Sequence, residues 1–202
     1  QGQLANNGET IRLVDATGAT ADKVHYATEG DWARRVRGPL HGGHRGWVWR
    51  AAYGGGGHSL ELMQPSLSNN HGQNWQTSVA GRGTPGRSNS SKLANLPPMI
   101  LDAAHSPAVP RSTDPVTVTA RVIDESPDEI SIQLFYRLDG EANFRELPMA
   151  RSGSEQFAAT ISPQANGKVV EFYVSVTDGQ GAARTWPSAP NNCPRLLYQV
   201  DD

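Results

Sequence analysis

Residues 116–122 read Val-Thr-Val-Thr-Ala-Arg-Val, and residues 130–136 read Ile-Ser-Ile-Gln-Leu-Phe-Tyr. In both stretches apolar and polar side chains alternate, which is typical of a β-strand with one buried face. Further strands are predicted nearby, at residues 99–101, 144–147, 157–161, 169–176 and 196–200. The turn pairs between them are Asp139-Gly140, Asn166-Gly167 and Asp178-Gly179. Strands at such spacing predict an antiparallel sandwich of about seven strands.

The first half of the chain contains shorter strand patterns. Residues 10–14 and 23–26 are separated by a short turn, which predicts a hairpin. Residues 59–63 alternate again, and we expect Leu60 and Leu62 to point inward.

A stretch rich in Gly, Pro and Ser separates the two halves and favours extended backbone. We place the linker at residues 92–98, which gives a first domain of residues 1–91 and a second of residues 99–202. The charge distribution supports two domains, because residues 1–95 have a net charge of +4 and residues 96–202 one of −6.

The composition of the 202 residues excludes several classes of protein. Charged residues make up 19% and the net charge is −2, which does not fit a disordered polyelectrolyte. The sequence contains no apolar run of about 18 residues, so no membrane span is expected. No basic segment followed by an apolar stretch opens the sequence, so no signal peptide is visible in it. Cys193 is the one cysteine, which excludes an internal disulfide and a cysteine-based zinc site.

Residues 4–89 resemble the C-terminal part of a bacterial lamin tail domain. The motifs that carry this resemblance are Asn6-Asn7-Gly8-Glu9-Thr10-Ile11-Arg12-Leu13-Val14-Asp15, Val24-His25-Tyr26, Gly57-His58-Ser59-Leu60-Glu61-Leu62, Asn74-Trp75, Gly83-Thr84-Pro85-Gly86 and Asn89. The resemblance implies an immunoglobulin-like β-sandwich of the kind found in large secreted bacterial proteins. The two N-terminal strands of that family's pattern do not occur in the sequence.

The second half is similar, more generally, to fibronectin-III-like and immunoglobulin-like domains. The residues that carry this similarity are Val116 to Asp124, Phe135-Tyr136-Arg137 and Tyr173-Val174-Ser175-Val176-Thr177-Asp178. Together the two resemblances predict an all-β chain of two tandem immunoglobulin-like β-sandwiches, the first lacking its N-terminal strands. We expect those strands to come from a separate segment or partner, or the first domain to be incomplete.

The Gly-, Arg- and Trp-rich segment 28–58, predicted as a loop, is the most promising surface for a ligand. The candidate binding residues are Arg45, Trp47, Trp49, Arg50 and Tyr53. Interleaved aromatic and cationic side chains can stack on sugars or bases and neutralise anionic groups. The alternative is that one or two tryptophans fill the interior while the arginines are solvated.

Two groups of residues have side chains of the types that bind metal ions. His41 and His44 have a spacing that could chelate zinc, but glycines between them leave the pair poorly organised. Asp124, Glu125 and Asp128 form an acidic loop that could bind calcium, or could be a solvated turn. No other cofactor is expected. We found no Gly-x-Ser-x-Gly motif and no phosphate-binding Gly-Lys-Ser/Thr sequence.

The sequence therefore predicts a non-catalytic structural, adhesive or spacer region of a larger bacterial protein that is secreted or at the cell surface. Two alternatives stay open: a carbohydrate- or nucleic-acid-binding module that uses residues 32–53, and accessory domains of an enzyme whose catalytic domain lies elsewhere. The expected partners are other domains or chains of the parent protein and a polysaccharide or cell-surface ligand. Localisation is inferred from the resemblance alone.

Overall fold

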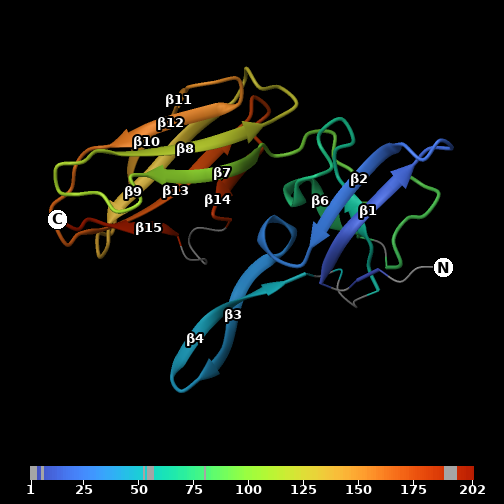
Figure 1. The fold of residues 1–202 in the computed structure, drawn as a ribbon, viewed down its shortest axis with the longest axis horizontal. Helices are drawn as coiled ribbons and strands as arrows, with labels where there is room; N and C mark the ends of the chain where they lie inside the picture. The colour runs from blue at the N-terminus through green and yellow to red at the C-terminus, as the bar shows by residue number, and fades with distance from the viewer. Residues whose placement is uncertain (1–3, 6, 52, 54–56, 80, 189–194) are drawn as a thin grey trace. The chain divides into compact units, whose positions relative to one another are not determined.

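The computed structural model describes residues 4–5, 7–51, 53, 57–79, 81–188 and 195–202. The chain divides into two compact units, Gln1–Leu96 (unit 1) and Pro97–Asp202 (unit 2). The described residues form β-strands and two short 3-10 turns, so the predicted all-β class is confirmed (Figure 1). None of their helical segments is long or apolar enough to cross a membrane. Cys193 lies outside the described residues.

Unit 2 is a sandwich of two antiparallel sheets. One sheet has the strand order β11-β12-β8-β7, and the other has the order β10-β9-β13-β14 with β15 also paired to β13. The strands are β7 (Met99–Ser106), β8 (Val116–Ile123), β9 (Ser131–Leu138), β10 (Arg145–Pro148), β11 (Ala150–Arg151), β12 (Gln156–Ile161), β13 (Val169–Thr177), β14 (Ala183–Trp186) and β15 (Leu196–Gln199). The sequence predicts seven of them and misses β11 and β14.

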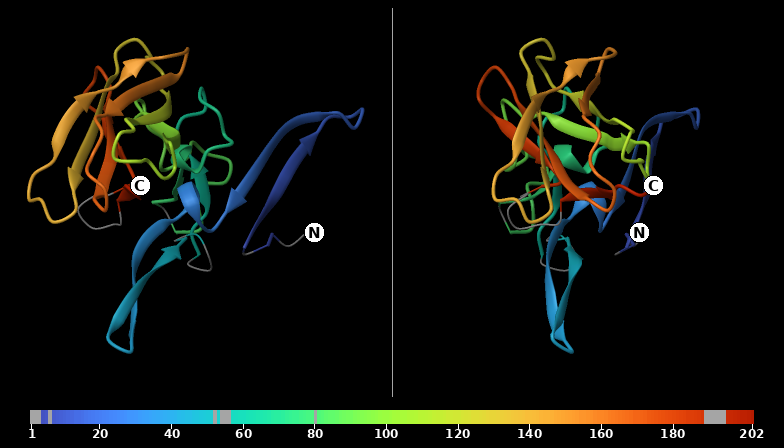
Figure 2. Two further views of the ribbon diagram at one scale, coloured as in Figure 1. Left: turned by 60° about the vertical axis from the view of Figure 1, so that its left-hand side comes forward. Right: turned by 90° about the vertical axis from the view of Figure 1, so that its left-hand side faces the viewer.

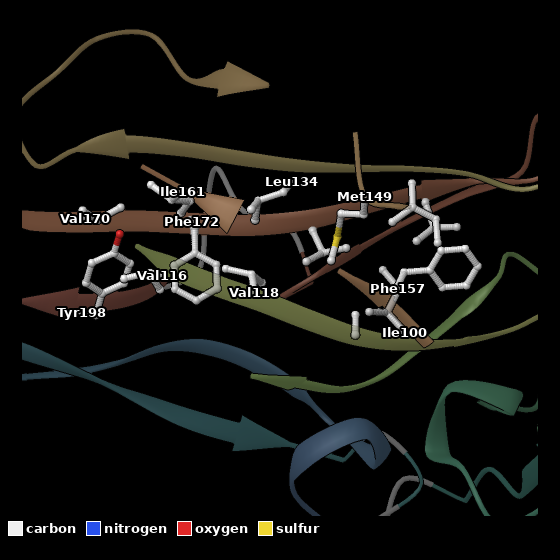
Figure 3. Close-up of a cluster of buried hydrophobic side chains, with 14 of the residues drawn as sticks. Ile100, Val116, Val118, Leu134, Met149, Phe157, Ile161, Val170, Phe172 and Tyr198 are labelled. Carbon is white, nitrogen blue, oxygen red and sulfur yellow. The ribbon is translucent and has the colours of Figure 1, made fainter. Parts of the chain in front are cut away.

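The alternating residues of β8, β9 and β13 build the core of unit 2. Val118, Leu134 and Phe172 are completely buried, and Figure 3 shows them among the aliphatic and aromatic side chains between the sheets. The intervening residues of β8 and β13 face away from this core and are only partly buried. Removal of this apolar surface from water is the main force that holds the two sheets together.

Unit 1 is built differently, from three separate two-stranded sheets rather than two large stacked ones among its described residues. The strand pairs are β1 (Gly8–Val14) with β2 (Thr20–Ala27), β3 (Arg34–His41) with β4 (His44–Arg50), and β5 (Leu60–Leu62) with β6 (Trp75–Thr77). Two 3-10 turns, η1 (Gly30–Trp32) and η2 (Gly72–Asn74), precede β3 and β6. The predicted hairpin at residues 10–14 and 23–26 is confirmed by β1 and β2.

The prediction of an irregular loop across residues 28–58 is wrong. Strands β3 and β4 form a long two-stranded ribbon in this segment, visible in Figures 1 and 2. Gly42 and Gly43 form its two-residue turn and both have positive φ, 54° and 82°. This backbone conformation suits the tight turn of a right-twisted hairpin, and glycine adopts it without steric cost.

The expected orientation of β5 is also wrong. The structure buries Glu61, whereas Leu60 and Leu62 are only partly buried. The carboxylate of Glu61 accepts hydrogen bonds from the hydroxyls of Thr84 (2.5 Å) and Ser90 (2.8 Å). It also accepts bonds from the backbone N–H (3.0 Å) and the hydroxyl (3.1 Å) of Ser91. A charged group tolerates burial when its oxygens are satisfied in this way.

Candidate functional site

The β3–β4 ribbon divides the predicted binding residues between its two faces. Arg35 pairs with Trp49 and Arg37 with Trp47, and these four side chains share one face because alternate residues of a strand point the same way. Arg34 pairs with Arg50, and their side chains point to the opposite face. Arg45 pairs with Leu40 near the turn, away from both sets.

Cation–π contacts organise the first face of the ribbon. The guanidinium carbon of Arg37 lies 4.5 Å from the ring centroid of Trp47, and that of Arg35 lies 5.3 Å from the ring of Trp49. Trp49 remains 40% exposed. The arginines therefore cover part of the indole surface on this face of the ribbon.

The opposite face of the ribbon borders a hollow of about 400 Å³. Arg34 and Arg50 line it together with Tyr53, which follows β4. The remaining lining residues come from η1 and from β5 and β6; they are Asp31, Trp32, Ala33, Leu60, Trp75, Gln76 and Thr77. Cationic, acidic and aromatic side chains thus meet in one place.

A second hollow, of about 320 Å³, shares the aromatic wall of the first. Trp32, Tyr53, Leu60 and Trp75 line both, and the second continues towards Tyr26 and other residues of the β1–β2 sheet. The ring centroids of Trp32 and Trp75 lie 5.9 Å apart with an interplanar angle of 35°. We call the two hollows together the aromatic trough; the hollow with Arg34 and Arg50 is its polar end, and the other is its apolar end.

Hydrogen bonds fix the rings of the aromatic trough. Trp75 donates its indole N–H to the carbonyl of Asn69 (2.7 Å), and Tyr53 donates its hydroxyl to the carbonyl of Ala27. Burial raises the pKa of Tyr53, so its hydroxyl stays protonated as the donor. These anchors leave the ring faces as the surfaces that a ligand can contact.

Sequence reasoning identifies Arg50 and Tyr53 but misses most of this site. Trp75 lies in a motif that suggests a structural role, and Asp31 carries no signal of its own. Trp32 and Arg34 stand in the Trp- and Arg-rich segment, but only the register of the hairpin shows that Arg34 faces Arg50. The Gly42-Gly43 turn alone would pair residue 35 with residue 50, and an irregularity between Arg37 and Leu40 shifts the register so that Arg34 pairs with Arg50.

Asp124, Glu125 and Asp128, the candidate calcium ligands of unit 2, are not grouped as a metal site in the structure. Asp124 is buried, and burial together with the nearby carboxylates of Glu125 and Asp178 raises its pKa. The side chain of Asp128 is 97% exposed and lies 3.8 Å from Arg151. Within the described part of the chain, no group of three His, Cys, Asp or Glu residues is arranged to hold a metal ion. Calcium binding stays a prediction.

The outer face of the larger unit 2 sheet carries a second aromatic cluster. Phe135 stacks on Tyr173 with centroids 4.8 Å apart, and Phe144 meets Tyr173 edge-on at 5.1 Å. Arg137 and Arg195 lie over the two faces or edges of Phe144, and both pair with Glu171. Because both arginines contact Phe144 and pair with Glu171, this cluster resembles a small secondary core more than an open site.

These features define unit 2 as an all-β sandwich of immunoglobulin-like type. Residues 97–187 match the family model described as "Alpha-1,4-glucan:maltose-1-phosphate maltosyltransferase, domain N/S". This part of the chain is thus similar to a domain of that enzyme family. A search of curated proteins found no match.

Among solved structures, one similar chain is an uncharacterized protein from Listeria monocytogenes EGD-e, determined in complex with glucose, magnesium and calcium. The identity is 14% and the TM-score is 0.38. The alignment covers 48% of this chain and 9% of that protein, so this chain spans a small part of its length. The lamin-tail and fibronectin-III resemblances, export and adhesion all stay predictions.

Proposed function

We propose that the chain is a non-catalytic accessory region of a larger enzyme that acts on carbohydrate. The observation that supports this proposal is the similarity of residues 97–187 to the N/S domain of an α-1,4-glucan:maltose-1-phosphate maltosyltransferase. Of the functions that the sequence predicts, this similarity favours the accessory enzyme domain over the adhesive spacer.

The packing of unit 2 supports a mechanical role rather than a chemical one. The inward-facing side chains of β8, β9 and β13 fill the space between the sheets (Figure 3). Function on such a fold has to lie in loops, edges or outer faces. We therefore assign unit 2 the role of a rigid body that connects neighbouring parts of the enzyme.

Two measurements test the proposal. The purified chain is incubated with maltose 1-phosphate and maltohexaose, and we expect phosphate release no faster than in buffer. The complete reading frame that encodes the chain is then sequenced, and we expect it to include a catalytic domain for carbohydrate. Turnover by the chain alone would overturn the non-catalytic assignment. A reading frame without any enzyme domain would overturn the accessory one.

A further inference from the structure

The polar end of the aromatic trough contains a like-charge pair that the fold itself does not neutralise. Arg34 and Arg50 lie directly opposite each other across the β3–β4 ladder, and both are exposed. Among the described residues, no ion pair joins either guanidinium to a carboxylate. Like charges at facing positions of a β-ladder destabilise it. An anion held between the two guanidiniums would remove that repulsion.

The aromatic wall beside this pair suits a ring with a weakly polar face. The rings of Trp32 and Trp75 are tilted by 35°, and the ring of Tyr53 completes the wall. The C–H bonds on one face of a sugar ring are attracted to the electron-rich face of an aromatic ring, and they lose contact with water there.

Asp31 limits the charge that the hollow accepts. It lines the same hollow and accepts a hydrogen bond from the side chain of Gln73 at 3.1 Å. A carboxylate is an acceptor only, so a sugar hydroxyl that reaches Asp31 would donate to it. Two guanidiniums and one carboxylate line the hollow, and this excess of cationic side chains favours an anionic ligand.

We infer that the polar end of the aromatic trough is a binding site for an acidic saccharide, with the carboxylate of a uronic acid unit held between Arg34 and Arg50. A planar carboxylate fits the donor geometry of guanidinium groups. Trp32, Tyr53 and Trp75 contact the sugar ring, and Asp31 accepts its hydroxyls. A hollow of about 400 Å³ is in the size range of small-ligand sites. The apolar end of the trough receives the next unit of the chain. This inference concerns unit 1 and does not depend on the accessory role proposed for unit 2.

To test this inference, the whole chain is titrated with trigalacturonate. Binding is measured by isothermal titration calorimetry and by tryptophan fluorescence. The variant Arg34→Gln/Arg50→Gln is compared with Arg37→Gln/Arg45→Gln, which removes the same charge from the same ribbon outside the hollow. We expect the first variant to bind about tenfold more weakly or worse, because it loses charge-assisted hydrogen bonds to the carboxylate. We expect the second to bind within about twofold of the parent chain.

Two further ligands and a stability measurement complete the test. Maltotriose, which lacks the carboxylate, should bind about tenfold more weakly than trigalacturonate or worse. Because Arg34→Gln/Arg50→Gln relieves a like-charge contact, it should unfold at a temperature no lower than the parent chain, so its loss of binding is not a loss of fold. Equal weakening by the two double variants, or tighter binding of an oligothymidylate than of trigalacturonate, would overturn the inference in favour of a general polyanion surface. No binding of trigalacturonate would overturn it outright.

Discussion

Units 1 and 2 are both antiparallel β-structures, yet they bury different kinds of side chain. In unit 2 the buried residues are mostly apolar, and Phe172 lies at the centre of a continuous core. In unit 1 the fully buried positions include Glu61 and Asn74, each held by several hydrogen bonds. At the same time Leu13 and Trp49 are exposed.

With the ligand site that we propose, recognition would belong to unit 1 and stability mainly to unit 2. Unit 2 gains its stability from apolar area removed from water, which requires its large side chains to be inside. Unit 1 places polar networks inside and leaves aromatic rings along its surface, where a ligand can reach them. The aromatic trough therefore lies in the unit with the less apolar interior.

The largest expected effect would sharpen this contrast in unit 2. Phe172→Ala removes a completely buried ring from the core and should lower the free energy of unfolding of unit 2 by about 3–5 kcal/mol. Phe135→Ala is the matched control, because Phe135 lies on the outer face and is only partly buried. Phe135→Ala should lower the free energy of unfolding of unit 2 by a clearly smaller amount. Hydrogen exchange measured by mass spectrometry reports the stability of unit 2 at β13 and that of unit 1 at β5 and β6. An equal loss of protection in both units would contradict independent cores.

A single methyl group should disturb unit 1 at the aromatic trough. A Cβ at Gly72 would lie 2.5 Å from the backbone carbon of Asp31 and 2.6 Å from the backbone nitrogen of Trp32, so η1 and η2 would have to separate. We expect Gly72→Ala to destabilise unit 1 by about 1–3 kcal/mol, as overpacking does. A Cβ at Gly46 meets nothing within 4 Å, so Gly46→Ala serves as the control.

The readout for this pair is urea unfolding followed by tryptophan fluorescence, since Trp32 and Trp75 report on the trough. An unchanged midpoint for Gly72→Ala would mean that the close approach of η1 and η2 is not needed for the fold. A shift for Gly46→Ala of similar size would mean that the ribbon, rather than the trough, limits the stability of unit 1.

The contrast also explains which parts of the structure could be predicted from the sequence. Strands such as β8 and β13 are predictable because one face packs on a large core, so the period of two is visible in the residues themselves. In unit 1 the burial pattern is inverted at Glu61, and the period of two gives the wrong face. The hydrogen-bond donors that reverse it, such as Ser90 and Ser91, lie 29 and 30 residues further along the chain.

The candidate site was predictable only in part, for a related reason. Composition draws attention to the Trp- and Arg-rich segment and to Arg50 and Tyr53 within it. The aromatic trough, however, needs the register that pairs Arg34 with Arg50 and the arrival of Trp75 from β6. Both depend on contacts between distant segments, which no local pattern encodes.

The last prediction concerns Glu61→Gln, whose diagnostic consequence is a changed response of stability to acid. Hydrogen bonds from Thr84, Ser90 and Ser91 lower the pKa of Glu61 from 4.5 to about 2 in the folded state. Because the folded pKa lies below the unfolded one, the stabilisation is complete above about pH 4.5 and is lost as the pH falls through 2. The urea midpoint of unit 1, measured between these pH values, should therefore fall with pH in the parent chain and fall less steeply in Glu61→Gln.

Glu29→Gln, at an exposed position, should keep the steep dependence. If the two variants respond to acid alike, the buried carboxylate does not organise unit 1, and the proposed difference between its polar interior and the apolar core of unit 2 fails at its most specific point.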